Sequence, residues 1–310
     1  MPLTRDESGI WTSRLNESEV GRINALYAEA MPRYLTIFDE VFNAAKRMNE
    51  LEFLFCLFRV KGVENAGWDP YQTTLESMPA LLDGANTIQN DTAARHLQLW
   101  IYGYIVGASE PYEMLANLLE VARGRHYAWN SNFPANKSGA PQSPGKKIRG
   151  IEELGIAAKL PNAAIPLKEV WHRELRNAVF HSDYIIYGSE VRILNPSRTF
   201  SDDEVLTLVN RAVAYHSALA TIFELYIKDY EEPTTIPTSP HYCGDSDLRW
   251  RIIIREGHGV AGVKDAWSRE QLQSGKIPLR IGRFFEDEVR MLNSDPTLDR
   301  LPNRGEQVIP

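Results

Sequence analysis

Apolar side chains recur every three or four residues over much of the first 230 residues, which is the spacing of one face of an amphipathic helix. Helices are therefore expected over about 34–60, 92–107, 110–123 and 201–226. Ser201 followed three residues later by Glu204 is typical of a capping box at the start of the last of these. A shorter helix is expected to begin near Asn16 and to be interrupted by Pro32.

One short stretch departs from the helical pattern. Residues 184–187 and 191–194 are rich in Ile, Val, Leu and Tyr, and they flank the loop Gly188-Ser189-Glu190, whose length is common in hairpins. The fold class expected for residues 1–230 is therefore mainly α, a helical bundle that carries a short β-hairpin.

The composition changes after residue 230. Residues 231–240 are rich in Pro and Thr and are expected to form a linker, and residues 241–310 a small α+β appendage with a polar tail. The pattern predicts strands over 248–255 and 277–280 and a short helix over 284–292. The glycines of 257–262 fit GxGxxG, but the remaining 48 residues are too few for the dinucleotide-binding unit, so a hairpin turn is expected there.

Charge and cysteine content narrow the function classes. The formal net charge of -7 excludes attraction of the whole surface to nucleic acid, so any such contact must come from a local patch. The two cysteines have no metal-ligand spacing and suggest no disulfide framework, and no apolar stretch is long enough to span a bilayer. These features predict a cytoplasmic protein with no membrane contact, no metal site and no cofactor.

Polar residues follow one face of a helix expected to begin near Pro166. Arg173, Asn177 and His181 stand at four-residue steps, with Arg176 one position to the side of Asn177. The opposite face carries an apolar stripe, made of Leu167, Trp171, Leu175 and Ala178. By itself, such a polar ridge is usually only the solvated face of a helix.

The segment Arg176-Asn177-x-x-x-His181 resembles the Rx4-6H motif of HEPN domains, and the string from 174 to 184 extends the likeness. The resemblance implies a HEPN-like helical bundle that forms a homodimer through the motif helix. It also implies a metal-independent endoribonuclease, expected to be a toxin or an antiviral defence effector. The RNA 2′-hydroxyl would attack the adjacent phosphate and leave a 2′,3′-cyclic phosphate.

The same resemblance assigns roles to the three catalytic candidates. Arg176 would stabilise the phosphate charge, His181 would transfer protons and Asn177 would orient the histidine. HEPN toxins that are controlled by nucleotidyltransferase antitoxins carry a Tyr two residues after the His, whereas this chain has Asp183 there and Tyr184 one position later. An antitoxin or activator therefore remains an open class of partner.

A basic segment precedes the motif. Residues 121–151 contain no acidic residue in a chain with 41 of them, and their prolines and glycines predict an irregular loop. Basic and aromatic side chains together suit single-stranded RNA, although a plain mobile connector is an equal alternative. The expected RNA-binding residues are Arg123, Arg125, Tyr127, Trp129, Lys146, Lys147 and Arg149, together with Arg173 of the polar ridge.

Two alternatives to a ribonuclease remain open. The first is a catalytically silent HEPN-like module that binds RNA, a nucleotide or a protein partner. The second is a helical scaffold without a ligand. RNA cleavage in EDTA separates the ribonuclease from both, and the salt dependence of RNA binding separates the two alternatives from each other.

Overall fold

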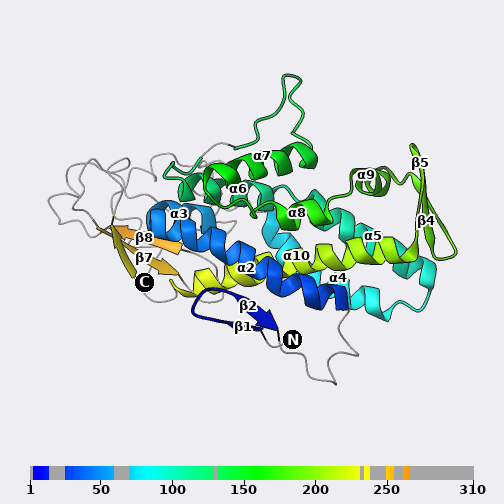
Figure 1. The fold of residues 1–310 in the computed structure, drawn as a ribbon, viewed down its shortest axis with the longest axis horizontal. Coiled ribbons are helices and arrows are strands. Elements are labelled where there is room, and N and C mark those ends of the chain that lie inside the picture. Colours follow the sequence, from blue (N-terminus) through cyan, green and yellow to red (C-terminus); the bar gives the residue numbers. More distant parts are fainter. Residues whose placement is uncertain are drawn as a thin grey trace, which may run out of the picture. The chain divides into compact units, whose positions relative to one another are not determined.

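The chain is mainly helical, with three small antiparallel sheets (Figure 1). The computed structural model describes residues 3–13, 25–58, 70–128, 131–230, 234–237, 249–254 and 261–265. The helices are α2 (Ala25–Met48), α3 (Glu50–Phe58), α4 (Pro70–Thr87), α5 (Asp91–Gly107), α6 (Glu110–Ala122), α7 (Pro144–Ala157), α8 (Ile165–Val170), α9 (Arg173–His181) and α10 (Asp202–Lys228). The strands are β1 (Leu3–Arg5), β2 (Trp11–Ser13), β3 (Tyr184–Tyr187), β4 (Glu190–Leu194), β5 (Ser197–Phe200), β6 (Thr234–Pro237), β7 (Arg249–Ile254) and β8 (Ala261–Asp265).

The chain divides into two compact units whose segments alternate along the sequence. Unit 1 comprises Met1–Val41, Pro70–Ala116 and Phe133–Ile222, and unit 2 comprises Phe42–Asp69, Asn117–Asn132 and Phe223–Pro310. This division differs from the predicted boundary after residue 230. Most of residues 241–310 lie outside the described residues, so the separate appendage stays a prediction, as do its tail, its strand over 277–280 and its helix over 284–292.

In unit 1, α2 and α10 lie side by side (Figure 1) and bury aromatic side chains between them. Tyr34 and Phe38 are completely buried, and the rings of Phe38 and Tyr215 meet edge to face, with centroids 5.8 Å apart. The prediction that Pro32 interrupts this region is wrong, because α2 continues through it. Burial of the residues on both sides offsets the lost backbone hydrogen bond, which costs about 3 kcal/mol.

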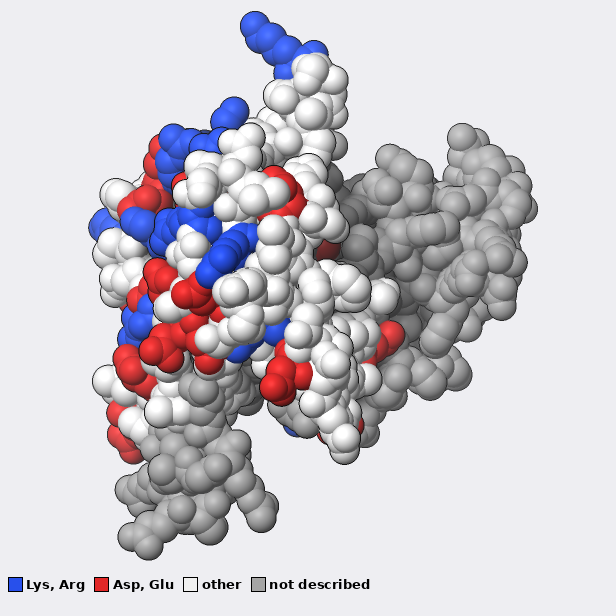
Figure 2. Space-filling view, turned by 90° about the vertical axis from the view of Figure 1, so that its right-hand side faces the viewer, with Lys and Arg blue, Asp and Glu red and all other residues white. Residues whose placement is uncertain are grey.

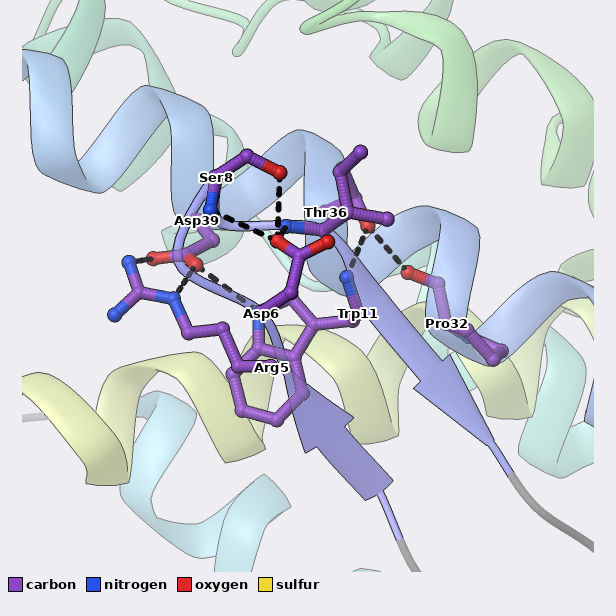
Figure 3. A network of polar contacts seen from close by, with 8 residues as sticks. Arg5, Asp6, Ser8, Trp11, Pro32, Thr36 and Asp39 are labelled. Carbon is purple, nitrogen blue, oxygen red and sulfur yellow. Dashed lines mark hydrogen bonds and ion pairs between the residues drawn. The ribbon is translucent and has the colours of Figure 1, made fainter.

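The hairpin β1–β2 is fastened to α2 by polar contacts (Figure 3). The indole Nε1 of Trp11 donates to Oδ2 of the buried Asp39 at 3.0 Å, and Arg5 Nη2 donates to its Oδ1 at 2.9 Å. The backbone N–H of Trp11 donates to Thr36 Oγ1, which itself donates to the carbonyl of Pro32. The helix expected to start near Asn16 falls outside the described residues over 14–24.

In unit 2, α3 is buried from Leu51 to Leu57, and every residue of this stretch is apolar except Glu52. The predicted long helix over 34–60 is thus two helices that break at Asn49. The Glu52 carboxylate accepts one hydrogen bond from the backbone N–H of Tyr127 at 2.8 Å and pairs with His126 Nδ1 at 2.7 Å. Cys56 is buried in this helix, and its burial raises the pKa of the thiol.

The segment expected to be a linker, 231–240, contains a strand. Residues Thr234–Pro237 form β6, which pairs antiparallel with β7, and β7 pairs antiparallel with β8. The predicted strand over 248–255 is confirmed as β7. Proline and threonine suit an edge strand, which is where the order β6-β7-β8 puts them.

The predicted helices over 92–107, 110–123 and 201–226 are confirmed as α5, α6 and α10. The capping box is formed as expected, with Ser201 Oγ accepting from the backbone of Glu204 and the Glu204 carboxylate accepting from the backbone of Ser201. The hairpin is confirmed as β3–β4, and a third strand, β5, extends it to a meander. Glu190 is already in β4, so the turn consists of Gly188 and Ser189, with Gly188 at a φ of 61°.

Candidate functional site

The motif helix is shorter than predicted, because the chain breaks at Trp171 and His172 between α8 and α9. The hydroxyl of Tyr102 on α5 holds this break: it donates to the carbonyl of Val170 at 3.0 Å and accepts from the N–H of His172 at 3.1 Å. These bonds replace helical hydrogen bonds that the break removes.

His172 begins α9 as its N-cap rather than packing within a helix, because its Nδ1 accepts from the backbone of Leu175 at 3.3 Å. Burial and the charge of Arg198 lower the pKa of His172, which favours the neutral ring that this cap requires. Its ring also meets Phe200 edge to face, with centroids 4.9 Å apart, so the start of α9 rests on β5.

The buried side of α9 rests on α5. Leu175, Ala178 and Val179 are buried. With the buried Leu167 of α8, this confirms three of the four members of the predicted apolar stripe. Two glycines of α5 allow the close approach: a Cβ on Gly103 would lie 2.9 Å from Val179 Cγ1, and one on Gly107 would lie 2.6 Å from Phe180 Cζ. The position of the motif helix therefore depends on glycine at these two places in α5.

Arg176 is half-buried and lies against the helix instead of extending into solvent. Its guanidinium stands 3.9 Å from the ring centre of Phe180, and its Nη1 donates to Asn177 Oδ1 at 3.3 Å. Its Nε is buried without a hydrogen-bond partner among the described residues. Burial lowers the pKa of Arg176, opposed by Tyr112 and Tyr102, but a guanidinium remains charged at neutral pH.

His181 is the last residue of α9 and is exposed, followed by Ser182 in the left-handed conformation at a φ of 55°. Residues five positions apart stand about 140° apart around a helix, so Arg176 and His181 point to different sides. No hydrogen bond joins the two within the described part of the chain. Asn177, which was expected to orient the histidine, bonds to Arg176 instead.

The basic segment over 121–151 is not one irregular loop. Residues from Pro144 onwards form α7, with Pro144 in its first turn, so Lys146, Lys147 and Arg149 are helical. The prolines and glycines of 134–145 predict an irregular loop, but Pro144 is well suited to the first turn of a helix.

The expected RNA-binding residues differ in exposure and are divided between the two units. Tyr127 is buried, Arg123 pairs with Glu120 at 2.9 Å, and Trp129 lies outside the described residues. Arg125, Lys146, Arg149 and Arg173 are exposed. Arg123 and Arg125 belong to unit 2, whereas the α7 residues and Arg173 belong to unit 1.

Lys147 is buried rather than available to a phosphate. Its ammonium donates to Ser109 Oγ at 3.2 Å and stands 5.7 Å from the ring centres of Tyr112 and Phe133. Burial lowers the pKa of Lys147. An apolar pattern could have predicted this, because Lys147 precedes Ile148 and Ile151 on one side of α7.

Arginines near the motif also have acidic neighbours. On the end that carries β3–β5, basic and acidic side chains adjoin one another (Figure 2). Arg198 of β5 pairs with Glu174, and Arg192 of β4 pairs with Glu190 at 2.8 Å. Arg173 and Arg176 have no ion pair among the described residues, which leaves them as the cations of α9.

Sequence reasoning missed the aromatic residues beside the motif. Trp100 and Tyr104 stand one turn apart on α5 and are 58% and 38% exposed, and Phe180 of the motif is 50% exposed. Together with apolar residues of α4 and α5 they line a pocket of about 470 Å³. The available signal was a pair of large aromatic residues four positions apart, Trp100 and Tyr104, on one side of the predicted helix over 92–107.

Comparison with known proteins gives no relative: no family model, curated protein or solved structure matches this chain. Among helices in the described residues, none has both the length and the apolar character needed to cross a membrane. Over the same residues, no group of three or more His, Cys, Asp and Glu side chains is arranged to hold a metal ion.

Proposed function

We propose that the protein is a HEPN-type endoribonuclease that cleaves cytoplasmic RNA without a metal ion. One observation carries the proposal: α9 ends in an exposed His181 and presents Arg173 and Arg176, which have no ion pair among the described residues. A guanidinium can bind two phosphate oxygens, and an imidazole can exchange a proton with the 2′-hydroxyl or the leaving oxygen.

The proposed enzyme is a homodimer in a HEPN-like bundle, with α9 at the two-fold axis. One copy supplies a single histidine, whereas attack and departure each need a proton-transfer group. Arg176 and His181 of one copy also point to different sides of α9, so an arginine of one copy facing the other copy's histidine would complete the site. A role as a toxin or antiviral effector, with an antitoxin or activator as partner, is part of this proposal.

The chemistry is tested with single-stranded RNA in EDTA. His181→Ala and Arg176→Ala are each expected to slow cleavage by about 10²–10⁴-fold, because each removes a group that acts in the transition state. Arg47→Ala is the matched control, since Arg47 is an exposed arginine of α2 outside the motif. Products should end in a 2′,3′-cyclic phosphate, and a 2′-O-methyl group at the cut should block the reaction. Cleavage that requires magnesium would refute this mechanism.

The shared site is tested by co-expressing wild-type and His181→Ala chains in equal amounts. If each active dimer needs both histidines, activity should fall to about one quarter, the fraction of wild-type pairs, instead of one half. A value near one half would mean that each chain acts alone. Light scattering on the same samples reports whether dimers are present.

The contacts of Arg176 favour a second candidate, a catalytically silent module that binds RNA, a nucleotide or a protein. Its guanidinium is stacked on Phe180 and bonded to Asn177 within the same chain, which is a structural use of the motif. In that case Arg176→Ala would lower the melting temperature, and RNA would bind with steep salt dependence but remain uncut.

A further inference from the structure

The pocket beside the motif helix lies entirely within unit 1. Its walls are Leu81 of α4, with Leu97, Trp100 and Tyr104 of α5 and Val179 and Phe180 of α9. Its volume of about 470 Å³ falls within the range of small-ligand sites. The lining is apolar and aromatic, as is usual for a site that binds a flat organic ring.

Three large aromatic side chains around one hollow are not explained by packing alone. Single exposed apolar residues are ordinary on a protein surface, but Trp100, Tyr104 and Phe180 surround the same space. The ring of Phe180 is fixed from two sides, by the guanidinium of Arg176 and by the glycine surface of α5. A ring held in place loses little entropy when a ligand stacks on it.

Two residues of the lining, Tyr104 and Ser77, carry hydroxyl groups. The hydroxyl of Tyr104 accepts from Thr74 Oγ1 at 3.1 Å, so its own proton is able to point elsewhere. The hydroxyl of Ser77 donates to the carbonyl of Thr73 at 2.6 Å, which leaves lone pairs to accept. A purely hydrophobic partner would leave these groups without use, whereas the edge of a nucleobase carries both donors and acceptors.

We propose that this pocket binds one unpaired nucleobase of the RNA substrate, while Arg173 and Arg176 bind the adjoining phosphates. The inference rests on the proposed function, because it names the substrate as single-stranded RNA and gives it a base subsite next to the cleavage site. Charge complementarity supports this occupant over an apolar protein segment. Arg176 is stacked on Phe180, which lines the pocket, and Arg173 begins the same helix; neither has an ion pair in the described residues.

The test compares two fluorescent hexamers in an anisotropy titration of the full chain. One is a 2′-O-methyl RNA, which is not cleaved because it has no free 2′-hydroxyl to attack the phosphate. The other has the same backbone without bases. Stacking of one base is expected to make the first bind about fivefold to 150-fold more tightly, since the phosphate contacts are equal. Trp100→Ala should bring the affinities of the two hexamers close to each other, and Trp100→Phe should restore the difference between them.

Tyr187→Ala is the matched control, because Tyr187 is 64% exposed on β3 and does not line the pocket. If the two hexamers bind equally, or if a chain that cleaves RNA binds neither, the base subsite is refuted. Neither outcome contradicts the proposed ribonuclease activity. A base-dependent ratio lost in Trp100→Ala, without any cleavage, supports the subsite and overturns only the ribonuclease. If Trp100→Ala instead converts a dimer to a monomer and leaves the ratio unchanged, a second copy covers the pocket and the inference is wrong.

Discussion

Gly103→Ala should loosen the contact between α5 and the motif helix, and the distances at Gly103 set the change expected in the free energy of unfolding. Replacing a glycine inside a helix with alanine ordinarily stabilises a protein by about 1 kcal/mol. At Gly103 the new Cβ would lie 2.9 Å from Val179 Cγ1 and 3.4 Å from Phe180 Cε2, and overpacking of this kind costs about 1–3 kcal/mol. The net change should therefore lie between zero and about 2 kcal/mol of destabilisation.

Gly84→Ala in α4 is the matched control. A Cβ there would meet only Leu97 Cδ2, at 4.0 Å, so this variant should keep the propensity gain without the clash. The difference between the two variants isolates the overpacking and should be about 1–3 kcal/mol. Guanidinium unfolding followed by circular dichroism measures both. If Gly103→Ala stabilises as much as Gly84→Ala, then α9 does not rest on α5 as described.

Two further predictions concern stability. His216 is buried and its pKa is lowered by burial to about 4, below the ordinary 6.5, so the folded state resists its protonation. Stability should therefore be full above pH 6.5, decline by up to about 3 kcal/mol as the pH falls from 6.5 to about 4, and level off below that. The free energy of unfolding of His216→Gln should depend less on pH over this window. Ser201→Ala should cost about 1 kcal/mol in chemical denaturation, because it removes the side-chain hydrogen bond of the N-cap of α10. Ser182→Ala should cost less, because Ser182 caps the end of α9 through its backbone N–H and not through its hydroxyl.

Local rules predicted much of the helical framework. The capping box of α10, the helices α5 and α6 and the β3–β4 hairpin depend on residues close together in sequence, so their patterns are visible without the fold. The spacing of Arg176, Asn177 and His181 is likewise a local pattern that is visible without the fold. It predicts that they share one helix, which the structure bears out, although the helix begins at Arg173 and not near Pro166.

Contacts between distant residues decided the rest. Helix α2 continues through Pro32 because it is packed on both sides, and the chain breaks before α9 because Tyr102, 70 residues away from His172, takes over its backbone hydrogen bond. Strand β6 forms in an expected linker because β7 offers it a partner.

The candidate site shows the same division. The sequence alone determined which residues with phosphate and proton chemistry lie on α9. Only the tertiary structure decided that Arg176 is stacked on Phe180, that Lys147 is buried, and that Gly103 lets α9 approach α5 beside an aromatic pocket. Periodicity reports which face of a helix is apolar, but the partner that covers that face, and the space left beside it, depend on side chains far away in the chain.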